Sequence, residues 1–287
     1  MKVLVFGSRG WIGTQFTALL DAATDVEWVQ AESRADDVEA VRREIDTSDP
    51  THVISLIGRT HGPGASTIDY LEGDGKLREN VRDNLFSPVV LALVCRDAGV
   101  HFTYLGTGCI FDSGSADPSS MRAFKELDMP NYFGSSYSTV KGFTDRLMPL
   151  LGDHVLNLRI RMPITGKRHS RNFITKITTY ERICSMPNSM SVMPELLPAA
   201  LDLMRRSYVG TLNFTNPGTI SHNEILELYR DIVDPTFKWS NFSLEDQDQL
   251  LASGRSNNML DTGKLSEACP EIRPIREAVE ACLRAYA

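Results

Sequence analysis

The chain has 287 residues, 42% of them hydrophobic and 23% charged, which indicates a folded globular protein rather than a disordered one. Its net charge of −7 argues against a nucleic-acid partner, because phosphate backbones favour basic surfaces. No apolar run approaches the roughly 20 residues that span a bilayer, and the first residues lack the layout of a signal peptide. We therefore expect a cytoplasmic protein with no membrane partner.

Short apolar runs alternate with longer amphipathic runs over the first 160 residues. The runs that predict strands are Val3–Phe6, Val26–Val29, Val53–Ile57, His101–Leu105 and Val155–Ile160. The runs that predict helices are Ile12–Leu20, Val38–Ile45, Leu85–Ala98 and Tyr137–Leu151. Strands that alternate with helices at this spacing predict an α/β fold with a doubly wound parallel sheet.

The alternation ends at Pro163, where a basic stretch, 164–194, begins. Further helices and a strand follow, and Ser221 with Glu224 three residues later is typical of a helix-capping box. We predict a nucleotide-binding domain and a small non-contiguous annex. The domain is expected at 1–164, rejoined by about 195–235, and the annex at 165–194 and 236–287.

Five cysteines are scattered through the chain without a CxxC pair. They are Cys95, Cys109, Cys184, Cys269 and Cys282. An odd, irregular set predicts reduced thiols instead of a disulfide framework or a zinc site. No metal is expected.

A glycine-rich turn lies directly between the first predicted strand and the first predicted helix. It reads Gly7-Ser8-Arg9-Gly10-Trp11-Ile12-Gly13. Glycines at such a turn let the backbone approach a pyrophosphate, which then lies at the positive end of the helix. In this position the motif predicts a dinucleotide cofactor.

The residues after the second predicted strand bear on which cofactor binds. Glu32 could accept a ribose hydroxyl of NADH, whereas Ser33 and Arg34 suit the 2′-phosphate of NADPH. We favour NADPH and keep NADH as the alternative. A surface role for Arg34 fits the residues nearly as well.

Tyr137 and Lys141 form a YxxxK pair near the start of a predicted helix, so both side chains share one face. The charge of the lysine favours the phenolate, so the tyrosine can exchange a proton with a substrate oxygen near neutral pH. Thr107, at the end of the fourth predicted strand, can donate a hydrogen bond to the same oxygen. Together the three residues predict reduction of a carbonyl group by a nicotinamide cofactor.

These motifs resemble the extended short-chain dehydrogenase/reductase family, which has a Rossmann fold, over roughly residues 1–165. Further segments are similar to the bifunctional nucleotide-rhamnose synthases of plants and large DNA viruses. They are Leu105–Phe111, Arg159–Tyr180, Asn213–Gly218, Ser221–Ile225 and Arg255–Asn258. The resemblance implies 3,5-epimerisation and then NADPH-dependent 4-reduction of UDP-4-keto-6-deoxyglucose to UDP-L-rhamnose.

The resemblance also implies an acid–base pair for the epimerisation. Cys109 is placed as one member and Lys176 as the other. The C4 carbonyl acidifies the protons at C3 and C5, and a thiol or a lysine with a lowered pKa can remove them. Residue type alone favours Cys109 as a small buried apolar side chain, and the motif around it favours the catalytic role. The alternative for Lys176 is a phosphate ligand. The basic stretch is expected to line a pocket for a diphosphate. Its members are Arg159, Arg161, Lys167, Arg168, Arg171, Lys176 and Arg182.

Substrate recognition is predicted on two parts of the chain. A glycine-rich loop after the third strand departs from the plant pattern and is expected to border the sugar. Its candidates are Arg59, Thr60 and His61, of which His61 is equally well an ordinary loop histidine. The annex is expected to bind the diphosphate through Arg255, because its planar guanidinium pairs two oxygens at once. Asn172 and Asn258 are the expected helpers.

Three alternatives remain open. A 4-keto-rhamnose reductase without epimerase activity would not need Cys109 and Lys176. An epimerase-reductase of the GDP-fucose type fits the segments around Lys176 and Arg255 less well. A regulatory NADP-binding protein of the same fold is disfavoured because Thr107, Tyr137 and Lys141 are all present. The resemblance further implies a homodimer and a separate 4,6-dehydratase that supplies the substrate.

Overall fold

The computed structural model describes residues 1–64, 67–115, 117 and 119–286, without the side chain of Asp248. The chain forms two compact units, each assembled from separate segments. Unit 1 comprises Met1–Thr107, Ser136–Arg159 and Leu197–Leu212, and unit 2 comprises Gly108–Ser135, Ile160–Leu196 and Asn213–Ala287. No helix in the described part of the chain is long and apolar enough to cross a membrane.

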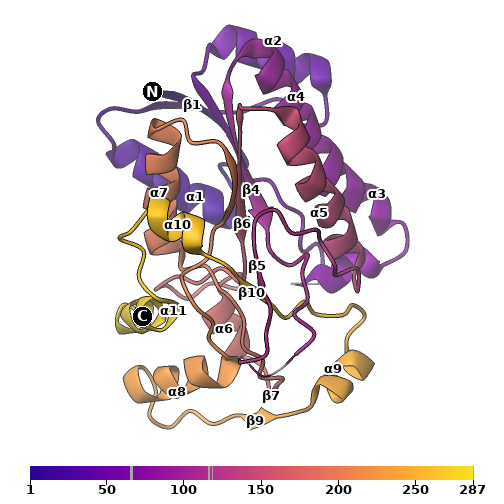
Figure 1. Ribbon diagram of the computed structural model, residues 1–287, viewed down its shortest axis with the longest axis vertical. Coiled ribbons are helices and arrows are strands. Elements are labelled where there is room, and N and C mark those ends of the chain that lie inside the picture. The colour runs from indigo at the N-terminus through magenta and orange to yellow at the C-terminus, as the bar shows by residue number, and fades with distance from the viewer. Residues whose placement is uncertain (65–66, 116, 118, 287) are drawn as a thin grey trace. The chain divides into compact units, whose positions relative to one another are not determined.

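A six-stranded sheet in the order β2-β1-β3-β4-β6-β8 organises unit 1 (Figure 1). Its strands are β1 (Lys2–Phe6), β2 (Glu27–Gln30), β3 (His52–Ser55), β4 (His101–Thr107), β6 (Val155–Ile160) and β8 (Gly210–Asn213). The pairs β1–β2, β1–β3 and β3–β4 are parallel. The order reverses at β1, and in open parallel sheets ligands bind beyond the carboxyl ends of the strands at such a switch point. The predicted α/β sheet is confirmed.

Helices cover both faces of this sheet, with α1 and α7 on one face and α2, α4 and α5 on the other (Figure 1). The helical segments are α1 (Trp11–Ala22), α2 (Val38–Ser48), η1 (Ile68–Glu72), α3 (Lys76–Val81), η2 (Arg82–Phe86), α4 (Ser87–Ala98), α5 (Ser136–Leu147), η3 (Met148–Leu151) and α7 (Met193–Arg205). The predicted helix Leu85–Ala98 is longer than expected, because α3 and the π-helical turn η2 precede α4 without a break. Buried side chains of β1, β4, α2 and α4 form one hydrophobic core.

Unit 2 consists of short elements around a separate apolar core. They are β5 (Ala123–Phe124), α6 (Phe173–Ile177), β7 (Arg182–Ile183), α8 (His222–Ile232), β9 (Ser240–Asn241), α9 (Leu244–Leu250), β10 (Met259–Leu260), α10 (Gly263–Ala268) and α11 (Ile275–Arg284). Side chains of α6, α8 and α11 are buried together. The capping box predicted at Ser221 and Glu224 is present at the start of α8.

The division of the chain differs from the predicted domains mainly at two segments. Residues 108–135 and 213–235 belong to unit 2, although both are expected in the nucleotide-binding domain, and the short stretches 160–164 and 195–196 also belong to unit 2. The first segment joins unit 2 because Ile110, Phe111 and Phe124 are buried in one cluster with Leu260. Strand β5 in this segment also pairs with β10.

Two buried histidines face each other on adjacent strands of unit 1. His52 and His101 begin β3 and β4, and their ring centroids are 5.0 Å apart. His101 Nε2 lies 2.8 Å from the carbonyl oxygen of Tyr208 and must donate, since a carbonyl only accepts. Burial, and then the charge of His101, lowers the pKa of His52 to about 4. Burial also lowers the pKa of His101.

This pair predicts that unit 1 loses stability in mild acid. Between pH 6.5 and about pH 4, His52 is protonated in the unfolded chain but stays neutral in the folded chain. The free energy of unfolding therefore falls as pH falls through this range. The loss attributable to His52 is at most about 3 kcal/mol. His52→Gln should flatten the slope in chemical unfolding between pH 7 and pH 5. His61→Gln, in a loop of the same unit, should not, and equal slopes in both variants would refute the assignment.

Candidate active site

The glycine-rich turn after β1 has the shape that the sequence predicts. Gly7 has a φ of +85°, which favours glycine, and a Cβ on Gly13 would lie 2.1 Å from the Gly7 carbonyl oxygen. Gly10 is the N-cap of α1 and contributes no capping side chain. The turn therefore lets a bound group come close to its backbone, and the first amide groups of α1 are available there. Both features suit a pyrophosphate. These residues fit the dinucleotide cofactor that the motif predicts.

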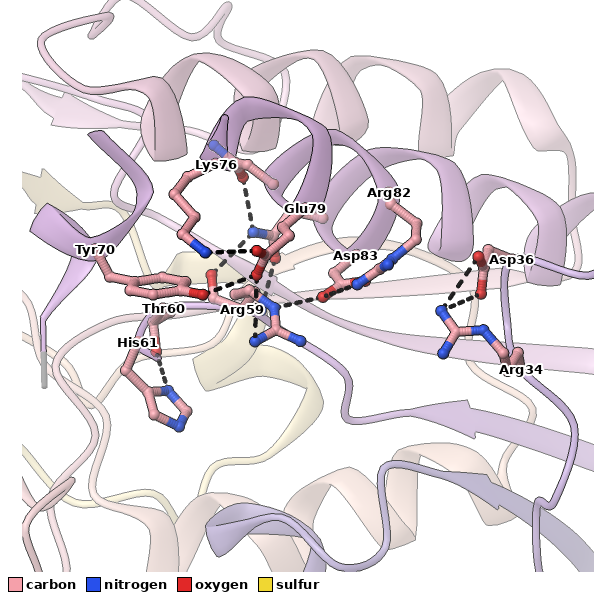
Figure 2. A network of polar contacts seen from close by, with 12 residues as sticks. Arg34, Asp36, Arg59, Thr60, His61, Tyr70, Lys76, Glu79, Arg82 and Asp83 are labelled. Atoms are coloured by element: carbon pink, nitrogen blue, oxygen red, sulfur yellow. Dashed lines mark hydrogen bonds and ion pairs between the residues drawn. The ribbon is translucent and has the colours of Figure 1, made fainter. Parts of the chain in front are cut away.

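The turn after β2 contains the residues that bear on cofactor choice. The Arg34 side chain is 66% exposed and pairs with Asp36 at 3.0 Å (Figure 2). The backbone amides of Glu32 and Ser33 both donate to the carboxylate of Glu44 on α2. Glu44 lies eleven residues beyond Ser33, so no local sequence pattern links it to this turn.

Unit 1 places the three predicted reduction residues at the ends of two elements. Thr107 ends β4, Tyr137 is the second residue of α5, and Lys141 lies one turn further along α5. All three are buried. The Lys141 ammonium group donates to the hydroxyl of Tyr104 on β4. Burial, and then the nearby Tyr137 and Asp145, raises the pKa of Tyr104 well above its ordinary value, so Tyr104 is a neutral partner for Lys141.

Asp145 continues the same face of α5 one turn beyond Lys141. Its carboxylate accepts from Arg159 Nε at 2.8 Å, from Arg159 Nη2 at 2.7 Å and from Asn157 Nδ2 at 2.9 Å. Arg159 is 2% exposed. The expectation that Arg159 lines a diphosphate pocket is therefore wrong, because its charge is neutralised inside unit 1.

The loop after β3 is tied down by a network of charges, which Figure 2 shows. Arg59 Nε lies 2.5 Å from the Asp83 carboxylate, and Arg59 Nη1 lies 3.8 Å from the Glu79 carboxylate. The Asn84 side chain also accepts from the backbone N–H of Arg59 and donates to its carbonyl oxygen. Arg59 thus fixes the loop through two acids of α3 and η2. Contact of its partly exposed side chain with a sugar stays a prediction.

The two residues after Arg59 lie close to each other. The Thr60 hydroxyl lies 3.5 Å from His61 Nδ1, and both side chains are partly exposed (Figure 2). Their predicted role in sugar recognition is neither supported nor opposed by this geometry.

Unit 2 holds the residues predicted to epimerise the sugar. Cys109 is half-buried, and none of the five cysteines forms a disulfide in the described part of the chain. Lys176 lies in α6, whose N-terminus is capped by Asn172. Burial, and then the charges of Arg171 and Arg255, lowers the pKa of Lys176. The role of Lys176 as an acid–base residue stays a prediction.

A cavity of about 570 Å³ lies within unit 2, a volume typical of small-molecule sites. It is lined by Asp112, Gly114, Ser115, Tyr132, Met186, Leu244, Gln247, Leu251, Ala252, Gly254, Arg255 and Asn257. Arg255 is held by the carbonyl oxygen of Ser253 at 2.9 Å. Arg255, which is predicted to bind the diphosphate, therefore lines a cavity. The ring of Tyr132 and the side-chain amides of Gln247 and Asn257 line the same cavity.

Arg161 supports this cavity from inside unit 2. It is 1% exposed and donates to Asn188 Oδ1 at 2.7 Å, to the Ser256 carbonyl at 2.7 Å and to the Asn258 carbonyl at 3.1 Å. Arg161 therefore fixes the backbone on both sides of Asn257 and does not itself line a diphosphate pocket, contrary to the sequence-based expectation.

The two asparagines expected to help bind substrate are fully buried. Asn172 donates to the carbonyl oxygens of Thr165 and Lys167, and Asn258 donates to those of Gly108 and Phe111. The amide nitrogens of both side chains are bonded within the chain. Both side chains position neighbouring backbone through these bonds, and their contact with a substrate stays a prediction.

Comparison with known proteins agrees with this arrangement. Residues 3–160 match the NAD dependent epimerase/dehydratase family, and the chain belongs to it. Protein L780 of Acanthamoeba polyphaga mimivirus is 54% identical over 275 residues, which are 96% of this chain and 95% of L780. A bifunctional dTDP-4-dehydrorhamnose 3,5-epimerase/dTDP-4-dehydrorhamnose reductase of Arabidopsis thaliana is 40% identical over 278 residues, with 96% and 90% coverage.

Solved structures extend the likeness. The crystal structure of the L780 UDP-rhamnose synthase has a TM-score of 0.96 and 52% sequence identity, and 99% of each chain is covered. The chain is thus a homologue of a UDP-rhamnose synthase. A dTDP-4-dehydrorhamnose reductase of Bacillus anthracis in complex with NADP has a TM-score of 0.80 at 16% identity, with 98% and 97% coverage, and shares the fold.

The surroundings of Lys176 predict an amine that loses its proton at a lower pH than an ordinary lysine. Removal of a neighbouring positive charge in Arg171→Ala should raise its pKa toward the ordinary value of 10.5. The pH dependence of the NMR signal of the dimethylated amine, assigned by its absence in Lys176→Arg, measures this. Arg182→Ala removes another arginine of the same stretch and should change nothing. An ordinary pKa in the unaltered protein would contradict the prediction.

Proposed function

We propose that this chain converts UDP-4-keto-6-deoxyglucose to UDP-L-rhamnose, by inversion at C3 and C5 and then reduction of C4 with NADPH. The full-length similarity to the L780 UDP-rhamnose synthase carries the proposal. The similarity to the plant epimerase/reductase over the whole chain supports the two activities. Each unit described above supplies residues with the chemistry that one of these steps requires.

The reduction relies on residues of unit 1. When bound, the nicotinamide cofactor supplies the hydride. The turn at 7–13 would hold its pyrophosphate, and Ser33 with Arg34 would meet the 2′-phosphate. Tyr137 gives a proton to the C4 oxygen, and Thr107 donates a hydrogen bond to that oxygen. Lys141, held by the neutral hydroxyl of Tyr104, supplies the positive charge that favours the phenolate left behind.

The epimerisation requires a base and an acid at each carbon. Removal of a proton from C3 or C5 leaves an enolate whose charge lies on the C4 oxygen, and return of a proton on the opposite face completes the inversion. We assign these transfers to Cys109 and Lys176. The lowered pKa of Lys176 supports this, because an amine that loses its proton more readily can act as a base.

The nucleotide is assigned to unit 2. Arg255 supplies a planar cation for the diphosphate, and the cavity that it lines has the volume of a small-molecule site. UDP is the nucleotide named for the viral homologue, and we adopt it for this chain.

An isotope experiment tests both activities at once. Incubation with NADPH and UDP-4-keto-6-deoxyglucose in deuterated water should yield UDP-L-rhamnose with deuterium at C3 and C5, observed by NMR. Cys109→Ser should slow this incorporation about 100-fold or more, the usual contribution of one acid–base group. Reduction of an already epimerised 4-keto-rhamnose should persist in that variant, because Tyr137 and Lys141 are unchanged.

Cys184→Ser, which removes a buried cysteine of the same unit, is the matched control and should keep full incorporation. Consumption of NADPH without deuterium at either carbon would identify a 4-reductase without epimerase activity. Unchanged incorporation in Cys109→Ser would remove this thiol from the mechanism. No reaction at all would contradict the proposed substrate.

The substrate must come from a 4,6-dehydratase. We propose that a separate enzyme provides this step.

A homodimer is proposed from an apolar surface on two neighbouring helical segments of unit 1. Helix α5 packs against α3 and η2. The exposed apolar side chains on these segments and the following turn are Leu77, Val81, Phe86, Phe143, Leu147 and Leu150. Exposed apolar side chains in such number commonly mark a protein interface.

Phe143, 60% exposed at this surface, provides the test of the dimer. A buried charge at an apolar interface is costly, so Phe143→Glu should yield a monomer by light scattering, at concentrations where the unaltered chain is a dimer. Phe133→Glu alters a comparably exposed ring in unit 2 and should leave the dimer intact. A monomeric unaltered protein, or a dimeric Phe143→Glu variant, would refute the proposal.

A further inference from the structure

Glu44 occupies a group of hydrogen-bond donors in the turn between β2 and α2. The backbone N–H of Glu32 lies 2.6 Å from Glu44 Oε1, and the backbone N–H of Ser33 lies 3.0 Å from Oε2. The Ser33 hydroxyl donates to the same Oε2. Both carboxylate oxygens therefore accept from consecutive residues of one turn.

Such a set of donors is suited to an anion. Consecutive backbone N–H groups that converge on one point form an anion-binding concavity, and a hydroxyl adds a further donor. A phosphate group would use the same donors that Glu44 now uses. Carboxylate and phosphate cannot both do so, because two negative charges would share one small site.

The turn lies where the adenosine ribose of a dinucleotide is expected. It follows the carboxyl end of β2, which is parallel to β1, and β1 leads into the glycine-rich turn. The Ser8 hydroxyl of the glycine-rich turn donates to Gln30 at the end of β2 at 3.0 Å. In dinucleotide-binding folds, the residues after the second strand distinguish a ribose hydroxyl from a 2′-phosphate.

The charges around the turn also disfavour a second anion. Arg34 is the cation best placed to attract a phosphate, but it already pairs with Asp36 at 3.0 Å. Asp36, Glu32 and Glu44 carry negative charges in or beside this turn, and Asp36 also interacts electrostatically with Arg82. A 2′-phosphate must therefore displace one carboxylate from the amides and compete with another for Arg34.

We propose that Glu44 is a cofactor-specificity residue, whose carboxylate occupies the anion site of the turn and selectively weakens the binding of NADPH. NADH lacks the 2′-phosphate and does not require these donors. Glu44 thus sets the difference in affinity between NADPH and NADH, even though Ser33 and Arg34 favour the 2′-phosphate. This inference rests on the nicotinamide cofactor of the proposed function but not on the sugar chemistry.

Binding of the two reduced cofactors to the full chain, followed by fluorescence titration without any sugar, tests this inference. Glu44→Gln keeps the shape of the side chain and removes its charge, and it should lower the Kd for NADPH about tenfold, a difference well within what one such charge can cause. The Kd for NADH should change less than about twofold. Glu44→Ala should shift the ratio of the two constants in the same direction, so the test does not depend on one variant.

Glu39→Gln is the matched control, because it removes an exposed carboxylate from the first turn of the same helix. It should leave both constants unchanged, which separates the local effect from net charge. An unaltered NADPH-to-NADH ratio in both Glu44 variants, or equal weakening of both cofactors, would overturn the specificity role and leave the proposed reaction standing. Binding of neither cofactor to the unaltered chain would overturn both.

Discussion

The buried ion pair between Asp145 and Arg159 is the interaction on which the reducing half of the chain depends. It joins α5 to β6 through two hydrogen bonds, and both side chains are almost fully excluded from solvent. Tyr137 and Lys141 lie on the same face of α5 at successive turns before Asp145. The pair therefore fixes the height and rotation of the helix that presents them. Loss of one partner would leave an uncompensated buried charge, a defect that typically costs about 3–5 kcal/mol.

Unit 2 also contains a buried arginine, Arg161, and its acceptors are neutral oxygens. The Arg161 guanidinium donates to neutral oxygens of Asn188, Ser256 and Asn258. A fully buried cation needs nearly all its donors satisfied, and only a well-ordered chain can supply so many oxygens. The buried Arg161 side chain also restricts the residue type at position 108, because a Cβ on Gly108 would lie 3.0 Å from it. The backbone that leads from Arg255 into β10 is thus shaped around one buried charge.

The sequence predicted features that depend on local spacing, and it missed those that depend on burial or on distant contacts. The glycine turn at 7–13 and the pair Tyr137 and Lys141 are such local patterns, and the structure builds both as expected. The sequence predicts that Arg159 and Arg161 line a diphosphate pocket, because a sequence shows charge but not depth. Tyr104 could have been suspected, since a tyrosine in an otherwise apolar strand usually needs a partner for its hydroxyl. Glu44 carried no such signal, because its partners are known only once α2 is folded onto the turn.

The two lysines show how one residue type can be adapted to different tasks. Lys141 donates to a phenol that burial keeps neutral, so its positive charge is held close to α5. Such a charge can favour the phenolate form of Tyr137 throughout a reaction. Lys176 lies among arginines, whose charges and the surrounding burial weaken its hold on a proton. In the proposed mechanism Lys141 serves as a fixed charge and Lys176 exchanges protons, and the two lysines differ in the groups that surround them, a neutral phenol for Lys141 and arginines for Lys176.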